Sequence, residues 1–247
     1  MDVLLIVIVI FLLLTVLSLC VWYHPNLLFY PINTVYRTDS SPRTNFYSPS
    51  DKNRIFPAGE ILESQWQDIR REGRQLYESL HDKQMNYLNQ YNIDIGAESK
   101  KDWTTIPLRL FGLDSGKYMS KCPITAEILK SHSEIKSCLF SFMSPGKVIE
   151  PHTCPYDGIL RYQLALEIPR GECYLHVGGE RYNWVEGEGV MFDEANIHGA
   201  VNKTDEIRVV LLIDIERPYS FLPYRIMNKT IIKGMGLLPA TKQATLL

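Results

Sequence analysis

Hydrophobic residues first gather in one uninterrupted segment near the start of the chain. Residues 3–23 carry no charged side chain. A helix of this length and composition can span a bilayer. A cleaved signal peptide is the alternative, but such peptides have a basic start, a shorter apolar core and a small-residue cleavage site, whereas Trp22 and Tyr23 end this segment. The pattern predicts a retained transmembrane helix over residues 1–23.

The charges that flank this segment favour one orientation. Arg37 and Arg43 follow it, whereas only Asp2 precedes it. Because basic residues tend to stay on the cytoplasmic side, we expect a single-pass membrane protein with its large domain in the cytoplasm. Two sequons, at Asn202 and Asn228, would indicate a secretory compartment if they were glycosylated.

The periodicity changes twice in the first half of the chain. Residues 24–57 are rich in Pro, Ser, Asn and Tyr without a sustained period, which is typical of a linker or arm. An apolar stripe with spacings of three and four then predicts a helix over about residues 60–86, which packs on its own domain. Residues 58–135 are expected to form a helical flank. The stripe consists of Leu62, Trp66, Ile69, Gly73, Leu76 and Leu80.

Short strands separated by turn residues dominate residues 136–218. Segments rich in β-branched and aromatic residues alternate with Gly- and Pro-containing turns, which predicts about eight strands in a mainly-β double-sheet roll or sandwich. The preceding helix would cover one sheet face. Residues 219–247 are expected to form a C-terminal tail. The predicted strands are residues 137–142, 159–167, 173–177, 180–184, 190–192, 199–202 and 208–215.

Composition narrows the function. The net charge of −2 and the 22% of charged residues exclude a strongly basic nucleic-acid binder, so we expect no nucleic-acid partner. The cysteines are widely spaced singles, with no close pair of the zinc or redox type. The two Gly-rich sites lie between predicted strands, where hairpin turns explain them better than a phosphate loop does.

Two histidines stand out because each lies at the edge of a predicted strand. His152 follows Glu150-Pro151, and His198 follows Asn196-Ile197. Two neutral imidazoles at rigid positions, with other coordination positions open, suit an Fe(II) site that also binds a keto acid and O₂. Such a pair alone is weak evidence, since unrelated loop histidines are common.

Two arginines in apolar strands strengthen the case. Arg208 begins one strand and Arg161 lies within another. A guanidinium that points inward needs an anionic partner, and a carboxylate held by two hydrogen bonds is the natural one. The alternative is a solvent-facing arginine or a salt bridge within the fold. This alternative weighs as much as ligand binding for Arg161 and less for Arg208.

Taken together, these segments resemble a known family. Residues 141–218, with motifs such as Glu150-Pro151-His152, Leu160-Arg161-Tyr162 and Ile197-His198, are similar to the aspartyl/asparaginyl beta-hydroxylases. Within that family the resemblance is strongest to its membrane-anchored lipid A hydroxylase branch. It implies a double-stranded beta-helix, of the jelly-roll or cupin-like type, over residues 136–218.

The resemblance also implies a cofactor and its ligands. The family binds Fe(II) and uses 2-oxoglutarate and O₂ as cosubstrates. By position, His152 and His198 match the iron ligands, and Arg208 matches the residue that holds the distal carboxylate of 2-oxoglutarate. Ser141 and Arg161 match positions that help to bind the same cosubstrate, and Gln163 stands where the family usually has a histidine.

Two positions depart from the family pattern. Cys154 stands where the lipid branch has an acidic residue and the peptide branch has glycine. It would be either a thiolate ligand of iron or a neutral filler, and we favour the filler because a thiolate would invite its own oxidation. Gln163 can donate a hydrogen bond to a carboxylate but carries no charge, so it would bind the cosubstrate more weakly than histidine.

We therefore expect a membrane-anchored dioxygenase that hydroxylates an unactivated C–H bond at the bilayer. A lipid acyl chain is the favoured substrate. Hydroxylation of an Asp or Asn side chain in a protein is the close alternative. A third possibility, of another class, is an inactive roll that binds a carboxylate ligand or a partner, which Cys154 and Gln163 would permit.

Overall fold

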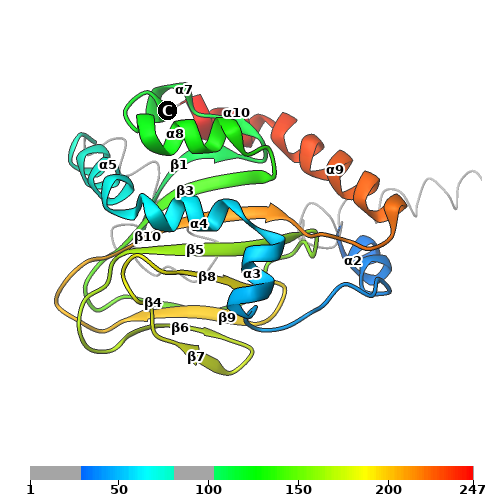
Figure 1. The fold of residues 1–247 in the computed structure, drawn as a ribbon, viewed down its shortest axis with the longest axis horizontal. Helices are drawn as coiled ribbons and strands as arrows, with labels where there is room; N and C mark the ends of the chain where they lie inside the picture. Colours follow the sequence, from blue (N-terminus) through cyan, green and yellow to red (C-terminus); the bar gives the residue numbers. More distant parts are fainter. Residues whose placement is uncertain (1–28, 81–102, 247) are drawn as a thin grey trace, which may run out of the picture.

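The computed structural model describes residues 29–80 and 103–246. In this part of the chain two antiparallel sheets face each other, and helices cover the outer face of the larger sheet (Figure 1). The larger sheet has the strand order β2-β1-β3-β10-β5-β8, and the smaller one β4-β9-β6-β7. The predicted mainly-β, cupin-like roll with flanking helices is confirmed. Its strands are β1 (Trp103–Leu110), β2 (Leu113–Asp114), β3 (Ile135–Met143), β4 (Val148–His152), β5 (Ile159–Glu167), β6 (Cys173–Val177), β7 (Glu180–Tyr182), β8 (Gly189–Phe192), β9 (His198–Asn202) and β10 (Arg208–Glu216).

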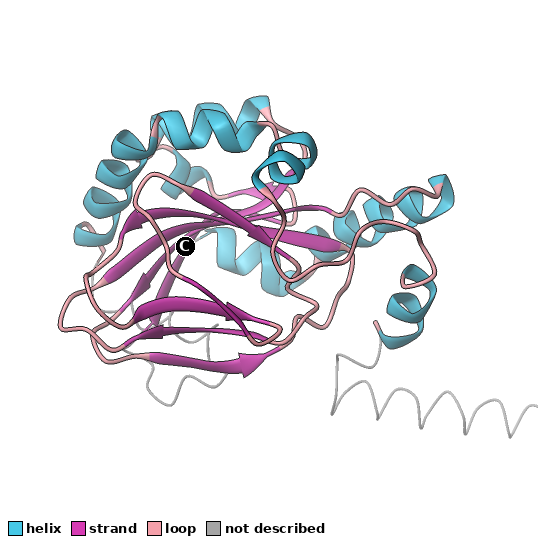
Figure 2. Cartoon of the chain, turned by 60° about the horizontal axis from the view of Figure 1, so that its bottom comes forward, coloured by secondary structure: helices cyan, strands magenta, loops and turns pink. Residues whose placement is uncertain are grey.

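Strand alternation divides the interior into two cores. On β10, Val209, Leu211 and Ile213 belong to the core between the larger sheet and the helices. Val210 belongs to a second core between the two sheets. Because successive side chains of a strand point to opposite faces, Arg208 lies on the same face as Val210, between the sheets. The two sheets face each other in Figure 2, so polar side chains on their inner faces must find partners between them.

The helical layer is built on the apolar stripe. Leu62, Ile69, Gly73 and Leu76 are buried toward the sheet. A side chain at Gly73 would begin 2.6 Å from the ring of Phe140, so this glycine permits the close approach. The expected single helix is instead two helices broken at Gln65, which the apolar spacing does not register, and residues 81–86 lie outside the described part. The layer consists of α3 (Pro49–Ile55), α4 (Ala58–Ser64), α5 (Trp66–Glu78), α7 (Gly116–Met119) and α8 (Pro123–Ser131).

Three segments contain secondary structure that their predicted descriptions did not include. The expected linker, residues 24–57, contains α2 (Tyr30–Tyr36) and α3, and Tyr36 at the end of α2 stacks on Tyr219 with ring centroids 4.4 Å apart. The expected helical flank contains β1 and β2, which extend the larger sheet through pairing with β3. The expected tail forms α9 (Leu222–Leu237) and α10 (Pro239–Leu246). Burial of aromatic side chains and strand pairing, which local composition does not reveal, determine all three.

The membrane prediction also needs correction. The predicted span, residues 3–23, lies outside the described residues. Within residues 29–80 and 103–246 no helix is both long and apolar enough to cross a membrane. The longest helix of this part, α9, has 16 residues and includes Lys229 and Lys233. The described residues thus contain no helix that supports the predicted single-pass membrane localisation with a cytoplasmic domain, and that prediction is not carried further.

Candidate functional site

The smaller sheet brings the two candidate histidines together. His152 ends β4 and His198 begins β9, and the two residues are register partners. Their ring centroids are 4.3 Å apart. The Nδ1 atom of His152 lies 2.8 Å from the carbonyl oxygen of Glu150, and that of His198 lies 2.9 Å from the carbonyl oxygen of Asn196. A carbonyl can only accept, so each Nδ1 carries the hydrogen and each Nε2 keeps its lone pair, as a metal ligand requires.

Burial keeps both imidazoles neutral. It lowers the pKa of His198 to about 3, with a further contribution from the Arg161 charge. Burial also lowers the pKa of His152. Neutral imidazole is the metal-binding form, so both side chains are available as ligands at neutral pH without releasing a proton.

Cys154 does not complete a third ligand position. No group of three His, Cys, Asp or Glu side chains in the described residues is arranged to hold a metal ion. Burial, followed by the nearby Glu194 carboxylate, raises the pKa of the Cys154 thiol well above its usual value. In the metal-free protein the thiol therefore stays protonated, as expected of a neutral filler.

Among the described residues, Arg208 is a buried cation without a carboxylate partner. Its side chain is 2% exposed. Nη1 donates to Ser141 Oγ at 3.3 Å and Nη2 to Met143 Sδ at 3.0 Å, while Nε has no partner among the described residues. Burial lowers the pKa of Arg208 to about 10, so it remains charged at neutral pH. Buried charges are ordinarily paired, so this guanidinium marks a place for an anion.

Arg161 is arranged differently, because its charge is already compensated. Nη1 lies 2.6 Å from Glu194 Oε2, and Nε donates to Asp214 Oδ1 at 2.8 Å. Burial opposes the charged guanidinium, but these two carboxylates outweigh it and raise the pKa of Arg161. Burial also raises the pKa of Glu194 to about 7. The salt bridge within the fold, the alternative considered for Arg161, is what the structure shows.

Ser141 and Gln163 present further polar groups from the larger sheet. Ser141 Oγ accepts from Trp103 Nε1 at 2.9 Å as well as from Arg208, so its hydroxyl hydrogen remains to be donated. Gln163 Oε1 accepts from Trp184 Nε1 at 3.2 Å. These contacts turn donor groups toward the interior of the roll.

All six candidate residues line one cavity between the sheets. It has imidazoles from the smaller sheet at one side and Arg208, Ser141 and Gln163 from the larger sheet at the other. Its apolar walls include Ile149, Leu175 and Leu212. The arrangement can hold a metal ion beside a small anion. Sequence reasoning assigned no role to Trp103, Met143, Trp184 or Glu194, since only the pairing of distant strands reveals their contacts.

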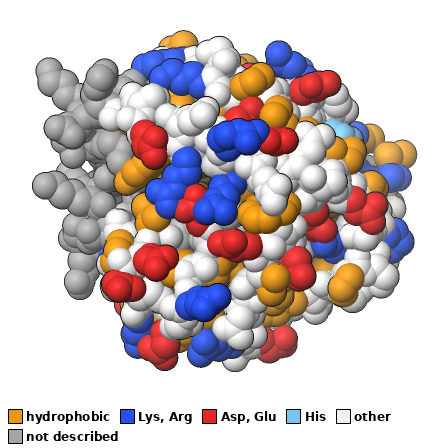
Figure 3. Space-filling view, turned by 60° about the vertical axis from the view of Figure 1, so that its left-hand side comes forward, with side chains coloured by type: hydrophobic (Ala, Val, Ile, Leu, Met, Phe, Trp, Pro, Cys, Tyr) orange, Lys and Arg blue, Asp and Glu red, His pale blue; other side chains and the backbone are white. Residues whose placement is uncertain are grey.

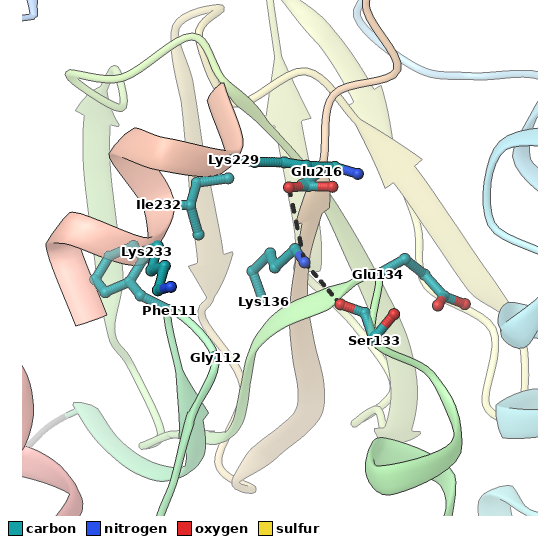
Figure 4. A pocket seen from close by; sticks show the side chains of 9 residues that line it. All are labelled: Phe111, Gly112, Ser133, Glu134, Lys136, Glu216, Lys229, Ile232 and Lys233. Atoms are coloured by element: carbon teal, nitrogen blue, oxygen red, sulfur yellow. Dashed lines mark hydrogen bonds and ion pairs between the residues drawn. The ribbon is translucent and has the colours of Figure 1, made fainter. Parts of the chain in front are cut away.

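Wider depressions lie on the surface but lack this chemistry. One, of about 510 Å³, lies between α9 and the start of β3, where Lys136 donates to Ser133 and pairs with Glu216 (Figure 4). Another, of about 580 Å³, lies beside α5, where Arg70 and Arg74 share Glu167. Acidic and basic side chains are interspersed on the face in Figure 3. Both depressions are lined by exposed charges and contain no histidine.

Comparison with known proteins gives a family. A family model described as Aspartyl/Asparaginyl beta-hydroxylase matches residues 63–218, more than half of the chain and a range that includes the whole cavity lining. The Ornithine lipid ester-linked acyl 2-hydroxylase of Rhizobium tropici is 33% identical over 135 residues, which cover 52% of this chain and 48% of that protein. Aspartate beta-hydroxylase domain-containing protein 2 of Homo sapiens is 31% identical over 171 residues, 64% of this chain and 44% of that protein.

The chain spans about half or less of the length of these relatives. Among solved structures, an oxidoreductase of the 2OG-Fe(II) oxygenase family from Burkholderia pseudomallei aligns with a TM-score of 0.36 and 14% identity. That alignment covers 53% of this chain and 78% of the solved one.

Proposed function

This chain belongs to the aspartyl/asparaginyl beta-hydroxylase family, and we propose that it is an Fe(II)- and 2-oxoglutarate-dependent dioxygenase that hydroxylates an unactivated C–H bond. The observation that carries the proposal is the buried guanidinium of Arg208, which meets no carboxylate in the described part of the chain and lines the same cavity as the paired histidines. A dicarboxylic keto acid suits both features, because one end carries an anion and the other can chelate a metal.

The histidine pair suits iron. His152 and His198 would bind the ion through Nε2, while their Nδ1–H groups, held by backbone carbonyls, fix the ring orientation. Two protein ligands leave enough coordination positions for a chelating keto acid and O₂. When bound, the iron would supply oxygen activation and oxidation of the target carbon.

The other polar residues would bind and orient the cosubstrate. Arg208 would pair with its distal carboxylate, Ser141 would donate its hydroxyl hydrogen and Gln163 an N–H group. Arg161 would support this site through its ion pairs with Asp214 and Glu194, which would hold its side chain in place at the cavity wall. The apolar walls would keep water from the reacting carbon.

For the target, we propose a lipid acyl chain, and the lipid would be the partner that the site receives. The similarity to a protein named as an acyl 2-hydroxylase supports this choice. Hydroxylation of a protein Asp or Asn side chain is the second candidate. The neutral Cys154, at a position that is acidic in the lipid branch, and the similarity to a Mus musculus protein named Aspartyl/asparaginyl beta-hydroxylase favour it.

Coupled turnover tests the enzyme directly. The purified protein with Fe(II), ascorbate and labelled 2-oxoglutarate is expected to form succinate and CO₂, and more rapidly when a lipid extract contains the acceptor. His198→Ala is the matched variant, because it removes one ligand and should abolish both products. No succinate from the native protein, together with no iron binding by titration, would instead favour an inactive ligand-binding roll. Added oxygen found on peptides but not on lipids would favour the second candidate.

A further inference from the structure

Trp184 lies behind the cavity wall and not in its lining. It is 5% exposed and packs in the core between the two sheets. Its indole contacts two of the residues that line the cavity. Nε1 donates to Gln163 Oε1 at 3.2 Å, and the guanidinium carbon of Arg208 lies 5.1 Å from the centre of a Trp184 ring.

The first contact fixes which end of the Gln163 amide faces the cavity. An indole N–H can only donate, so the Gln163 atom it meets must be the carbonyl oxygen. The NH₂ group then occupies the other end of the amide, and no hydrogen bond joins it to the described residues. Gln163 is 8% exposed and lines the cavity, so its NH₂ group is a donor at the cavity wall that is free to meet an acceptor.

The orientation matters because one end of the amide is a hydrogen-bond donor and the other end is an acceptor. If it turned over, the carbonyl oxygen would point into the cavity and repel an anion bound at Arg208. A neutral amide carries no charge that would prevent this rotation. The Trp184 N–H forms a hydrogen bond in only one of the two orientations and therefore stabilises that one. The ring face also lies close to Arg208 and attracts its charge without using a donor of the guanidinium.

We propose that Trp184 is a positioning residue that orients the Gln163 amide, so that its NH₂ group joins Arg208 in binding the distal carboxylate of 2-oxoglutarate. The inference rests on the proposed function and deepens it. Arg208 and Gln163 would contact the distal carboxylate, and Trp184 would contribute to the specificity for a dicarboxylate without contacting the ligand.

A double-mutant cycle separates orientation from simple packing. Trp184→Phe keeps a ring beside Arg208 and loses the N–H. The dissociation constant of 2-oxoglutarate, measured by calorimetry on Mn(II)-loaded protein, is expected to rise about fivefold, the effect of one hydrogen bond of ordinary net strength. Gln163→Ala should cause a similar rise, and adding Trp184→Phe to it should cause no more. Independent effects that multiply in the double variant would overturn the positioning role, as would an unchanged constant in Trp184→Phe.

Two controls keep the outcomes distinct. Trp66→Phe alters a tryptophan that lies against Gly187, in the loop that follows Trp184, and should leave the dissociation constant unchanged. Arg208→Met tests the proposed function itself. If it binds 2-oxoglutarate as tightly as the native protein, the proposed site fails; if it loses binding while Trp184→Phe does not, only the positioning role fails.

A measurement on the native protein covers the case in which Trp184→Phe does not fold. In Zn(II)-loaded, ¹⁵N-labelled protein, 2-oxoglutarate should shift the Gln163 side-chain NH₂ signals and slow their exchange with water. The Trp184 indole N–H signal should already be protected before the ligand is added. Rapid exchange of the Trp184 indole N–H with water would contradict the proposal. Gln163 side-chain signals that do not shift when 2-oxoglutarate is added would also contradict it.

Discussion

Arg161 and Arg208 line one cavity, yet replacing Arg161 by methionine should destabilise the protein, whereas replacing Arg208 by methionine should not. Arg161 compensates two buried carboxylates, those of Asp214 and Glu194. Removing one partner of a buried ion pair leaves the other charges uncompensated, so Arg161→Met is expected to lower the free energy of unfolding by about 3–5 kcal/mol.

Arg208 has no such role in the ligand-free protein. Burial lowers its pKa from 12.5 to about 10, and at about 1.4 kcal/mol per unit this corresponds to a cost of about 3 kcal/mol for keeping the charge in the folded state. Methionine removes that cost but also removes the contacts with Ser141 and Trp184, which contribute about 1 kcal/mol each. Arg208→Met is therefore expected to be as stable as the native protein or about 1 kcal/mol more stable.

Urea unfolding at pH 7.5, without metal or cosubstrate, distinguishes these expectations. Both variants exchange the same residue types at the wall of the same cavity on adjacent strands, so each controls for the other. Equal destabilisation by the two substitutions would refute the reasoning, because it would mean that Arg208 has a compensating partner in the folded chain.

Three further predictions concern other parts of the structure. Cys154→Ser should leave the metal dissociation constant within about twofold, because Cys154 completes no group of three metal-binding side chains among the described residues, and a tenfold loss in a metal titration would contradict this. In metal-free protein burial lowers the pKa of His198 from its ordinary value of 6.5 to about 3, so between these pH values the unfolded state binds more protons than the folded state. The free energy of unfolding should therefore fall on acidification below about pH 6.5, by up to about 1.4 kcal/mol per pH unit. Urea titrations at several pH values should show a smaller slope for His198→Gln. Gly73→Ala should lower the free energy of unfolding by about 1–3 kcal/mol because its Cβ would meet the Phe140 ring, whereas Gly234→Ala, in open space on α9, should leave it unchanged or raise it; urea unfolding measures both.

Strands with one or both faces buried in a core could be predicted from the sequence. The predicted bounds of β5 and β6 match the structure, and the prediction for β10 misses one residue at its end. Their apolar residues are continuous or alternate, so burial leaves a periodic signal. β4 was missed because it is short, contains Pro151 and has exposed positions, although it carries His152. Its strand character comes from pairing with β9, which no local pattern records.

The site was predicted as a set of residues but not as a network. Strand-edge position singled out His152 and His198, and an apolar surrounding singled out Arg208. Whether an inward arginine meets a carboxylate of its own chain depends on strand pairing, and Arg161 meets Asp214 because they are register partners on β5 and β10. The contact between Trp184 and Gln163 likewise joins residues 21 positions apart.

Anaerobic calorimetric titration of 2-oxoglutarate into the Fe(II)-loaded protein tests the central claim most directly. The native protein should show a single saturable site, and Arg208→Met should weaken binding about a hundredfold, as expected for the loss of a charge-assisted pair, while binding iron as tightly as before. Absence of saturable binding by the native protein, or equal affinity in Arg208→Met, would contradict the account.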